Sequence, residues 1–168
     1  LGFGAIGERL AQKAHALGIK VVALRQSPTP FGIDGVEAAR DIHDLFARAD
    51  HLVLAAPLTD ATRNIVDRDV LGSAKPGLHL INIARGGLLD QEALLEALDN
   101  GQIGLASLDV TEPEPLPDGH PLYSHPRVRL SPHTSAISTN SRNEIADTFL
   151  ANLERYISGT ELANLVNA

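Results

Sequence analysis

Three side chains that can bind a carboxylate or move a proton follow three apolar runs of the sequence. Arg85 comes just after "LHLINI", Glu114 a few residues after "GLASLDV", and His133 just after "VRLS". Taken singly, they are an arginine in a Gly-Gly turn, a solvated loop glutamate and a loop histidine. Because open α/β sheets bind ligands at the carboxyl ends of their strands, we expect the three to converge on one crevice. There the arginine can hold a carboxylate, and the histidine, its charged form stabilised by the glutamate, can transfer a proton.

These side chains need a sheet to position them, and the sequence alternates strand-like with helix-like segments. The apolar runs are continuous, which is typical of strands covered on both faces. Such an alternation predicts an α/β fold with a doubly wound parallel sheet, the Rossmann type, and right-handed crossovers. The predicted strands cover 1–3, 20–24, 51–56, 78–83, 104–110 and 128–131. The predicted helices cover 6–17, 42–49, 67–74 and 91–100.

Several residues are suited to begin or end these elements. Asp90 is placed to cap the helix that starts at 91, and Gly101 to end it. The stretch "STNSRNEIADTFLANLERYISG" predicts a long amphipathic helix, in which Ser141 and Glu144 have the spacing of a capping box. Proline-rich stretches at 113–121 and 28–30 predict loops. The expected apolar stripe of the long helix consists of Ile145, Phe149, Leu153, Tyr156 and Ile157.

The chain opens on a glycine-rich turn, "GFGAIG", in which Gly2, Gly4 and Gly7 form G-x-G-x-x-G. The first glycine permits a tight turn, the second lets the backbone approach a pyrophosphate, and the third lets the helix pack closely on the strand. The helix then presents free N–H groups to the phosphates. Glycine turns also serve strand-to-helix geometry alone. The position of this one inside a βαβ alternation is what predicts nucleotide binding.

The end of the second strand bears on which dinucleotide binds. In NAD-specific folds an Asp or Glu about 20 residues after the glycines accepts from the adenosine ribose. Here "VVALRQSP" places Arg25 at that point, with Ser27 close behind. An arginine cannot accept a hydrogen bond, but its planar fork suits a phosphate, so both residues favour NADP over NAD. The alternative is a solvated arginine in a protein that binds NAD through other contacts.

Composition excludes several classes of protein. The chain of 168 residues has 14 Lys and Arg against 21 Asp and Glu, a net charge of −7, which argues against nucleic acid as a partner. No apolar run approaches the ~20 residues of a membrane helix, and no signal peptide is visible. Cysteine is absent, which excludes disulfides and thiolate sites and fits a cytoplasmic protein. The remaining histidines lack metal-ligand spacing, so no metal site is predicted: His15, His43, His51, His79, His120 and His125.

Five motifs in this order resemble the D-isomer-specific 2-hydroxyacid dehydrogenases: "GFGAIG", "LAAPLTDATRNIV", "INIARGGLLDQEALLEAL", "SLDVTEPEPLP" and "VRLSPHTS". The resemblance covers nearly the whole chain. It implies the cofactor domain of a two-domain oxidoreductase that acts on the CH–OH of D-2-hydroxy acids. Such enzymes transfer hydride between NAD(P)H and a small 2-oxo acid.

The resemblance also implies roles for individual residues. Arg85 would hold the substrate carboxylate and polarise its carbonyl, His133 would be the general acid/base, and Glu114 would pair with that histidine. Asp109 would lie beside the nicotinamide carboxamide, and Glu112 falls outside the matching position. The expected cofactor contacts are Gly2, Gly4, Ala5, Ile6, Gly7, Arg25, Ser27, Pro57, Thr62, Ile83, Ala84, Asp109, His133 and Ala136.

Two departures from the family pattern bear on the cofactor and on the extent of the protein. Arg25 stands where many members have an aspartate, which points to NADP and to the members that reduce glyoxylate and hydroxypyruvate. The family's substrate domain is missing, and the chain lacks an initial Met, so we expect further chain upstream. We assign 1–150 to the dinucleotide-binding domain and 151–168 to a segment leading back toward the substrate domain. Alone, this chain should bind cofactor but turn over weakly or not at all. A homodimer is expected, as is usual in the family.

Two rival functions share parts of these motifs. Some relatives of these dehydrogenases are redox-sensing corepressors, so an NAD(P)-sensing binding module is the alternative to an enzyme. A sensor has no need of Arg85, Glu114 and His133 together, which favours the enzyme. A methyltransferase could share the glycine turn, but it would leave the later motifs without an explanation.

Overall fold

The structure, a computed structural model, describes residues 1–27, 30–138 and 141–165 of the chain. Two compact units divide the chain, Leu1–His133 and Thr134–Ala168. The side chains of Ser141 and Glu144 lie outside the described part, so the capping box stays a prediction.

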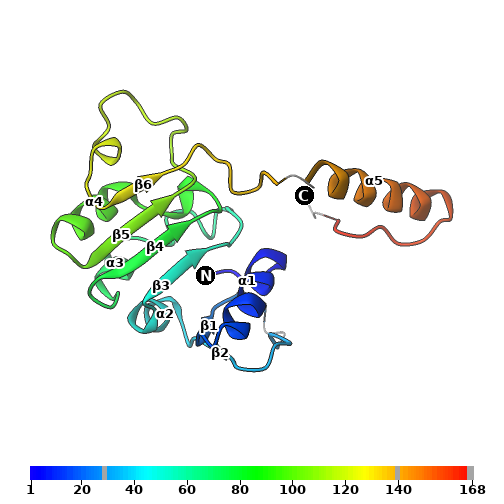
Figure 1. Ribbon diagram of the computed structural model, residues 1–168, viewed down its shortest axis with the longest axis horizontal. Helices are drawn as coiled ribbons and strands as arrows, with labels where there is room; N and C mark the ends of the chain where they lie inside the picture. Colours follow the sequence, from blue (N-terminus) through cyan, green and yellow to red (C-terminus); the bar gives the residue numbers. More distant parts are fainter. Residues whose placement is uncertain (28–29, 139–140, 166–168) are drawn as a thin grey trace. The chain divides into compact units, whose positions relative to one another are not determined.

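The first unit alternates helices and strands along the chain (Figure 1). All neighbouring strands are parallel: β1 pairs with β2, and β3, β4, β5 and β6 pair in that order. The α/β class with a parallel sheet is therefore confirmed. The strands are β1 (Val21–Ala23), β2 (Val36–Ala38), β3 (His51–Leu54), β4 (Leu78–Asn82), β5 (Ile103–Leu108) and β6 (Val128–Leu130). The α-helices are α1 (Ala5–Ala16), α2 (Ile42–Arg48), α3 (Arg68–Gly72) and α4 (Gln91–Asp99), with 3₁₀ turns η1 (Gly86–Leu88) and η2 (Pro121–Tyr123).

The first two residues bridge the two groups of strands. The Leu1 nitrogen donates to the carbonyl of Val53 at 2.8 Å, and Ala55 N–H donates to the Leu1 carbonyl at 2.8 Å. On the other side, Gly2 N–H donates to the Leu24 carbonyl at 2.8 Å. The segment predicted as a strand at 1–3 is not a regular strand, yet its backbone lies between β1 and β3 as a strand would. The glycine turn is thereby fixed at the centre of the unit.

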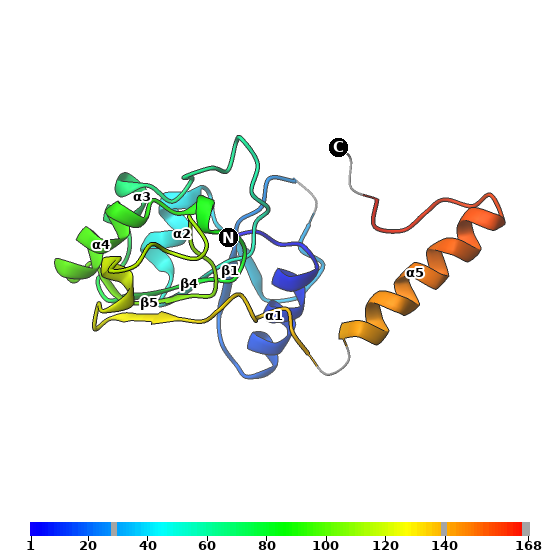
Figure 2. The same cartoon turned by 90° about the horizontal axis from the view of Figure 1, so that it is seen from above.

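The strands are covered unequally on their two faces, which corrects the expectation of full coverage. Leu52, Leu54 and Leu80 are buried on the face that carries α2, α3 and α4 (Figure 2). On the opposite face, His51 of β3 is exposed and Val53 is only half-buried. The reason is that α1, the helix on that face of the first unit, contacts mainly β1.

Aspartates begin three of the helices, because each carboxylate accepts from N–H groups that have no partner inside the helix. Asp41 accepts from Asp44 N, Asp67 from Val70 N, and Asp90 from the N–H groups at 92 and 93. The predicted cap at Asp90 is confirmed. So is the stop at Gly101, which has φ +80° and directly follows Asn100, the C-cap residue of α4.

The second unit contains the predicted long helix, α5 (Ser141–Ile157). The chain folds back beside it, where Asn152 accepts from Ala163 N–H at 2.9 Å and donates to the Ala163 carbonyl at 3.0 Å. All members of the predicted apolar stripe are exposed side chains: Ile145, Phe149, Leu153, Tyr156 and Ile157.

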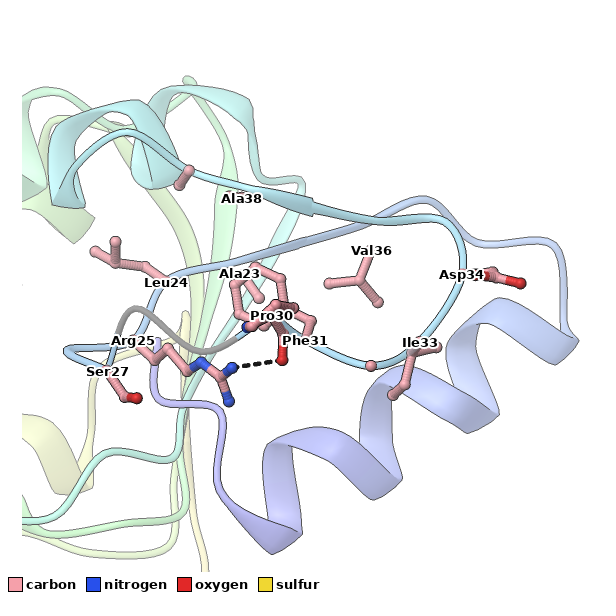
Figure 3. Close-up of a pocket in the computed structure, with 12 residues that line it drawn as sticks. Ala23, Leu24, Arg25, Ser27, Pro30, Phe31, Ile33, Asp34, Val36 and Ala38 are labelled. Carbon is pink, nitrogen blue, oxygen red and sulfur yellow. Dashed lines mark hydrogen bonds between the residues drawn. The ribbon is translucent and has the colours of Figure 1, made fainter.

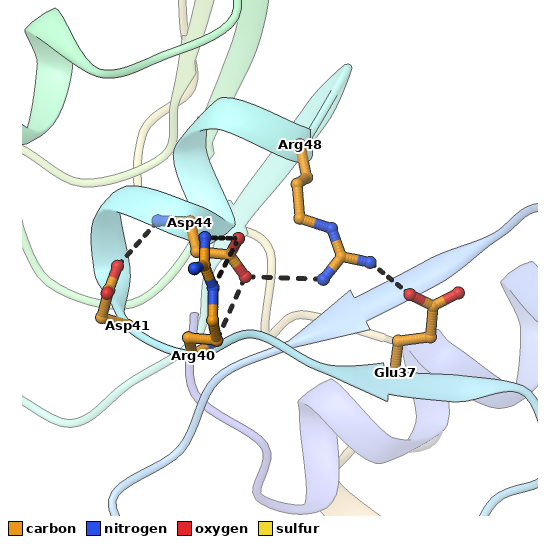
Figure 4. Close-up of polar contacts among 5 residues, drawn as sticks. All are labelled: Glu37, Arg40, Asp41, Asp44 and Arg48. Atoms are coloured by element: carbon orange, nitrogen blue, oxygen red, sulfur yellow. Dashed lines mark hydrogen bonds and ion pairs between the residues drawn. The ribbon is translucent and has the colours of Figure 1, made fainter.

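A charged cluster runs along α2 and ties its last residue, Arg48, to β2 (Figure 4). The Asp44 carboxylate accepts from Arg40 Nη2 at 2.9 Å and from the Arg40 backbone N–H at 3.1 Å. It also accepts from Arg48 Nη1 at 3.5 Å, and Arg48 in turn pairs with Glu37. The hydrogen bonds from Arg40 hold the pKa of the Asp44 carboxyl below its usual value of 3.8.

This lowered pKa gives the stability of the unit a pH dependence. Because the folded state favours the Asp44 carboxylate, its contribution is present above the unfolded pKa of 3.8 and is lost as pH falls through the lower folded value. We expect Asp44→Asn to lower the melting temperature near neutral pH and to lower it less as pH approaches roughly 3. Thermal unfolding followed by circular dichroism across this range measures the difference. Asp118→Asn, in an exposed loop, is the matched control for charge, and an offset that does not change with pH would contradict the prediction.

Candidate functional site

The glycine turn has the geometry of a cradle. Gly2 has φ +89°, and a Cβ there would lie 2.5 Å from Ala56 N. A Cβ on Gly7 would lie 2.5 Å from the Gly2 carbonyl oxygen, so the start of α1 packs directly on the turn. At Gly4, in contrast, a Cβ would meet nothing within 4 Å. The middle glycine therefore faces open space, as the close approach of a pyrophosphate to the backbone requires.

The N-terminus of α1 adjoins this space. Its N-cap is Gly4, which has no side chain to accept from the first N–H groups of the helix. Ala5 and Ile6 are exposed at the first turn, so their backbone can meet a phosphate. The residues present therefore fit a dinucleotide.

A cavity of about 590 Å³ opens beside the turn. One wall is the loop after β3, in which Thr62 Oγ1 donates to the Pro57 carbonyl at 2.7 Å and accepts from Thr59 N–H at 2.7 Å. The structure brings six of the predicted cofactor contacts to this cavity: Gly2, Gly4, Arg25, Ser27, Pro57 and Thr62.

A second cavity, of about 610 Å³, lies between β1 and the loop that leads to β2 (Figure 3). Arg25 lines both cavities. Its Nη2 donates to the Pro30 carbonyl at 2.6 Å, and its guanidinium carbon lies 5.0 Å from the ring centre of Phe31 and 5.8 Å from that of Phe3. The two rings contact each other edge to face at 4.6 Å. The arginine is thus held by aromatic rings at the end of β1, an arrangement that the sequence analysis missed.

His133 and Glu114 form a pair, as predicted. Their Nδ1 and Oε1 atoms are 2.8 Å apart, and the two side chains are 43% and 40% exposed. His133 has φ +53°, an uncommon conformation for a residue other than glycine. Its N–H donates to the carbonyls of Asp109 and Ser131, each at 3.0 Å, which fixes the turn after β6. The Nδ1 contact leaves Nε2 as the ring nitrogen that can exchange a proton with a substrate.

The turn that carries Arg85 is held by Asn82, a buried residue that sequence reasoning missed. Asn82 Oδ1 accepts from Ala84 N–H at 3.0 Å, and its Nδ2 donates to the Arg85 carbonyl at 2.9 Å. The signal was present as a polar residue inside an apolar run. The Arg85 guanidinium donates to the Ala84 carbonyl at 2.6 Å, and Ile83 N–H bonds the Leu54 carbonyl at 3.4 Å. The predicted residues 83 and 84 therefore lie at the carboxyl end of β4.

Asp109 ties the two neighbouring strand ends together. Its N–H donates to the Asn82 carbonyl at 2.9 Å, and its carboxylate accepts from the Ser131 hydroxyl. The side chain is buried, and it lines a cavity of about 400 Å³ with Glu114 and Tyr123. Ala136 belongs to the second unit, and its predicted contact with the cofactor stays a prediction.

Of the remaining histidines, His51 and His79 lie side by side on neighbouring strands, β3 and β4, with their Nδ1 atoms 3.2 Å apart. Burial and, second, the charge of His51 lower the pKa of His79 below 6.5.

Over residues 1–27, 30–138 and 141–165, no group of three or more His, Asp or Glu could hold a metal ion. None of the helices in this part of the chain is long and apolar enough to cross a membrane.

Residues 1–135 match the sequence model of the D-isomer-specific 2-hydroxyacid dehydrogenases, NAD-binding domain. The chain belongs to this family. The resemblance inferred from the five motifs is confirmed, and with it the Rossmann-type fold.

Individual members of the family can be compared with the chain. Glyoxylate/hydroxypyruvate reductase B of Serratia proteamaculans is 38% identical in an alignment of 169 positions, which covers 99% of this chain and 52% of the relative. Other relatives are named glycerate dehydrogenase and D-3-phosphoglycerate dehydrogenase. The chain spans about half the length of the curated relatives it matches.

Two solved structures of the family have nearly the same fold. The D-isomer-specific 2-hydroxyacid dehydrogenase of Xanthobacter autotrophicus Py2, in complex with NADPH and MES, has a TM-score of 0.90 at 31% identity, covering 99% of this chain and 68% of that one. The NADPH-dependent glyoxylate/hydroxypyruvate reductase of Sinorhizobium meliloti, in complex with NADP and sulfate, has a TM-score of 0.88 at 33% identity, covering 99% and 54%.

Proposed function

We propose that the protein carrying this chain reduces a small 2-oxo acid of the glyoxylate and hydroxypyruvate class to the D-2-hydroxy acid. The observation that carries the proposal is the 2.8 Å pair of His133 and Glu114 at the end of the sheet where Arg85 also lies. Membership of the family and the open space at Gly4 support it. The names of two similar proteins support this substrate class.

In the proposed mechanism, Arg85 binds the substrate carboxylate with its planar fork and polarises the adjacent carbonyl. A reduced dinucleotide, which Gly2, Gly4 and the first turn of α1 would hold, would supply the hydride for the carbonyl carbon. His133 Nε2 donates its proton to the carbonyl oxygen as the C=O double bond becomes a C–O single bond, which completes the alcohol. Glu114 accepts from Nδ1, so it orients the ring and stabilises the imidazolium before the proton leaves.

We further propose NADP as the preferred cofactor, on the position of Arg25 at the end of β1. The guanidinium lines the cavity beside the glycine turn, where the adenosine ribose would lie, and it can pair with a 2′-phosphate. The complexes of two similar structures with NADPH and NADP support this choice. The domain assignment of 1–150 and 151–168, the homodimer and the cytoplasmic location remain part of the proposal.

The experiment that tests the function is an assay of the protein that carries this chain. We expect NADPH to be oxidised when glyoxylate or hydroxypyruvate is added, with formation of glycolate or D-glycerate. NADPH binding without turnover of any small 2-oxo acid would favour the sensing module instead.

A binding titration of the same protein tests the role of Arg25. We expect Arg25→Ala to raise the Kd for NADPH about ten- to hundredfold, because one charge-assisted contact with the 2′-phosphate is lost. The Kd for NADH, which lacks that phosphate, should change much less. Isothermal titration measures both values. Arg68→Ala removes the same charge from α3 and is the control, and equal effects on the two cofactors would refute the assignment.

A further inference from the structure

Three loops at the carboxyl ends of the strands meet at Glu112, a residue to which the family resemblance assigns no role. The first is the loop after β3. Arg63 Nη1 donates to both carboxylate oxygens of Glu112, at 3.0 and 2.8 Å. Both side chains of this ion pair are about half exposed, at 49% and 47%, so its contribution to stability is small.

The second loop leads from β4 into α4. Gln91, the first residue of α4, uses its side-chain amide on the Glu112 backbone in both directions. Its Nε2 donates to the Glu112 carbonyl, and its Oε1 accepts from Glu112 N–H at 3.2 Å. The backbone of the loop after β5 is thereby fixed to the start of α4.

The close approach of these loops depends on two glycines of η1. A Cβ on Gly87 would lie 2.6 Å from Glu112 Oε2 and 2.9 Å from Arg63 Nη1. A Cβ on Gly86 would lie 2.1 Å from the carbonyl carbon of Thr111. The carboxylate of Glu112 therefore sits directly against the Gly-Gly turn that follows Arg85.

Each of the three loops carries one residue of the proposed site. Thr62 adjoins Arg63, Arg85 precedes the two glycines, and Glu114 lies two residues after Glu112. From this juxtaposition we propose that Glu112 is a positioning residue: it holds the loop of Glu114 so that this carboxylate meets His133, at a fixed distance from Arg85. The inference rests on the proposed function, because it takes Arg85, Glu114 and His133 as the residues that bind the substrate and transfer the proton.

The test is a double-mutant cycle on the protein that carries this chain. Glu112→Gln keeps the shape of the side chain and the backbone contacts with Gln91 but loses the ion pair. We expect it to lower kcat for glyoxylate about ten- to hundredfold, since displacing a catalytic group by ~1 Å has an effect of this size. In a protein that already carries Glu114→Gln, adding Glu112→Gln should lower kcat little further, because Glu112 acts through Glu114. Arg63→Gln removes the other partner of the ion pair and should lower kcat by a similar factor.

The control is Glu96→Gln, which breaks the exposed ion pair with Arg68 between α3 and α4 and should leave kcat unchanged. Circular dichroism and the Kd for NADPH establish that each variant is folded. Unchanged kcat in both Glu112→Gln and Arg63→Gln overturns the inference alone, and so does a loss that multiplies with that of Glu114→Gln. Full activity of Glu114→Gln overturns this inference and also the role proposed for Glu114, so the two failures are distinguishable.

Discussion

His133→Asn is expected to lower kcat for reduction of a 2-oxo acid about 10²- to 10⁴-fold, the usual contribution of a positioned general acid. The amide cannot donate a proton to the carbonyl oxygen, so the step would depend on water. Asparagine is chosen because it tolerates the left-handed conformation that His133 adopts, with φ +53°. The variant should therefore fold.

The measurement is steady-state kinetics with NADPH and glyoxylate, together with titration of the cofactor. His125→Gln is the matched control, because His125 also faces a carboxylate, Asp99, at 3.3 Å, in a pair outside the site. It should keep the wild-type rate. Retention of more than about a tenth of the activity by His133→Asn would remove His133 from the mechanism.

Gly86→Ala is expected to have the largest effect on stability. The new Cβ would lie 2.1 Å from Thr111 C, 2.2 Å from Thr111 O and 2.6 Å from Glu112 N. These are backbone atoms of the loop after β5, which cannot move aside as the end of a side chain can. Overpacking of this kind costs about 3 kcal/mol, which corresponds to a fall of roughly 6–12 °C in melting temperature for a domain of this size.

Thermal unfolding by circular dichroism checks this prediction. Gly72→Ala is the control, because a Cβ there meets nothing within 4 Å at the last residue of α3. It should melt at or slightly above the wild-type temperature, since alanine favours the helix. A melting temperature for Gly86→Ala within about 2 °C of the wild type would show that the two loops are not in this contact.

The local features of the fold could be predicted from the sequence because a few neighbouring residues determine them. Asp90 caps α4 through the N–H groups two and three residues ahead, and Gly101 ends it with a positive φ. The G-x-G-x-x-G turn is equally local. The pair of His133 and Glu114 is not local. The topology of a parallel sheet predicted that their loops converge, and the family resemblance implied that Glu114 is the glutamate that pairs with His133.

Features that depend on contacts distant in sequence were missed. The strand β2 consists of three residues with an exposed Glu37 at its centre, so no apolar run reveals it. The prediction that both faces of the sheet are covered was wrong at β3, where His51 is exposed. Continuous apolar runs do not reveal which helices lie on a face. The contacts of Glu112 with residues 49 and 21 positions away could not be read from "TEPEP". Ion pairs over such separations leave no periodic signal.

The division of the strands into two groups has a consequence for how such a protein can change over evolutionary time. Arg25 and Phe31 belong to the β1–β2 pair, whereas Arg85, Asp109 and His133 follow β4, β5 and β6. The two groups are joined by the backbone hydrogen bonds of the first two residues and by the packing of Val22 and Leu24 on the common core, so the residues named above are not part of the junction. Under the proposed function, substitutions that alter the choice of reducing cofactor fall in the β1–β2 group, and substitutions that alter kcat fall in the β3–β6 group. Under the same proposal, we expect that the choice between NADP and NAD can be re-engineered without a compensating change in the residues proposed to carry out the reaction.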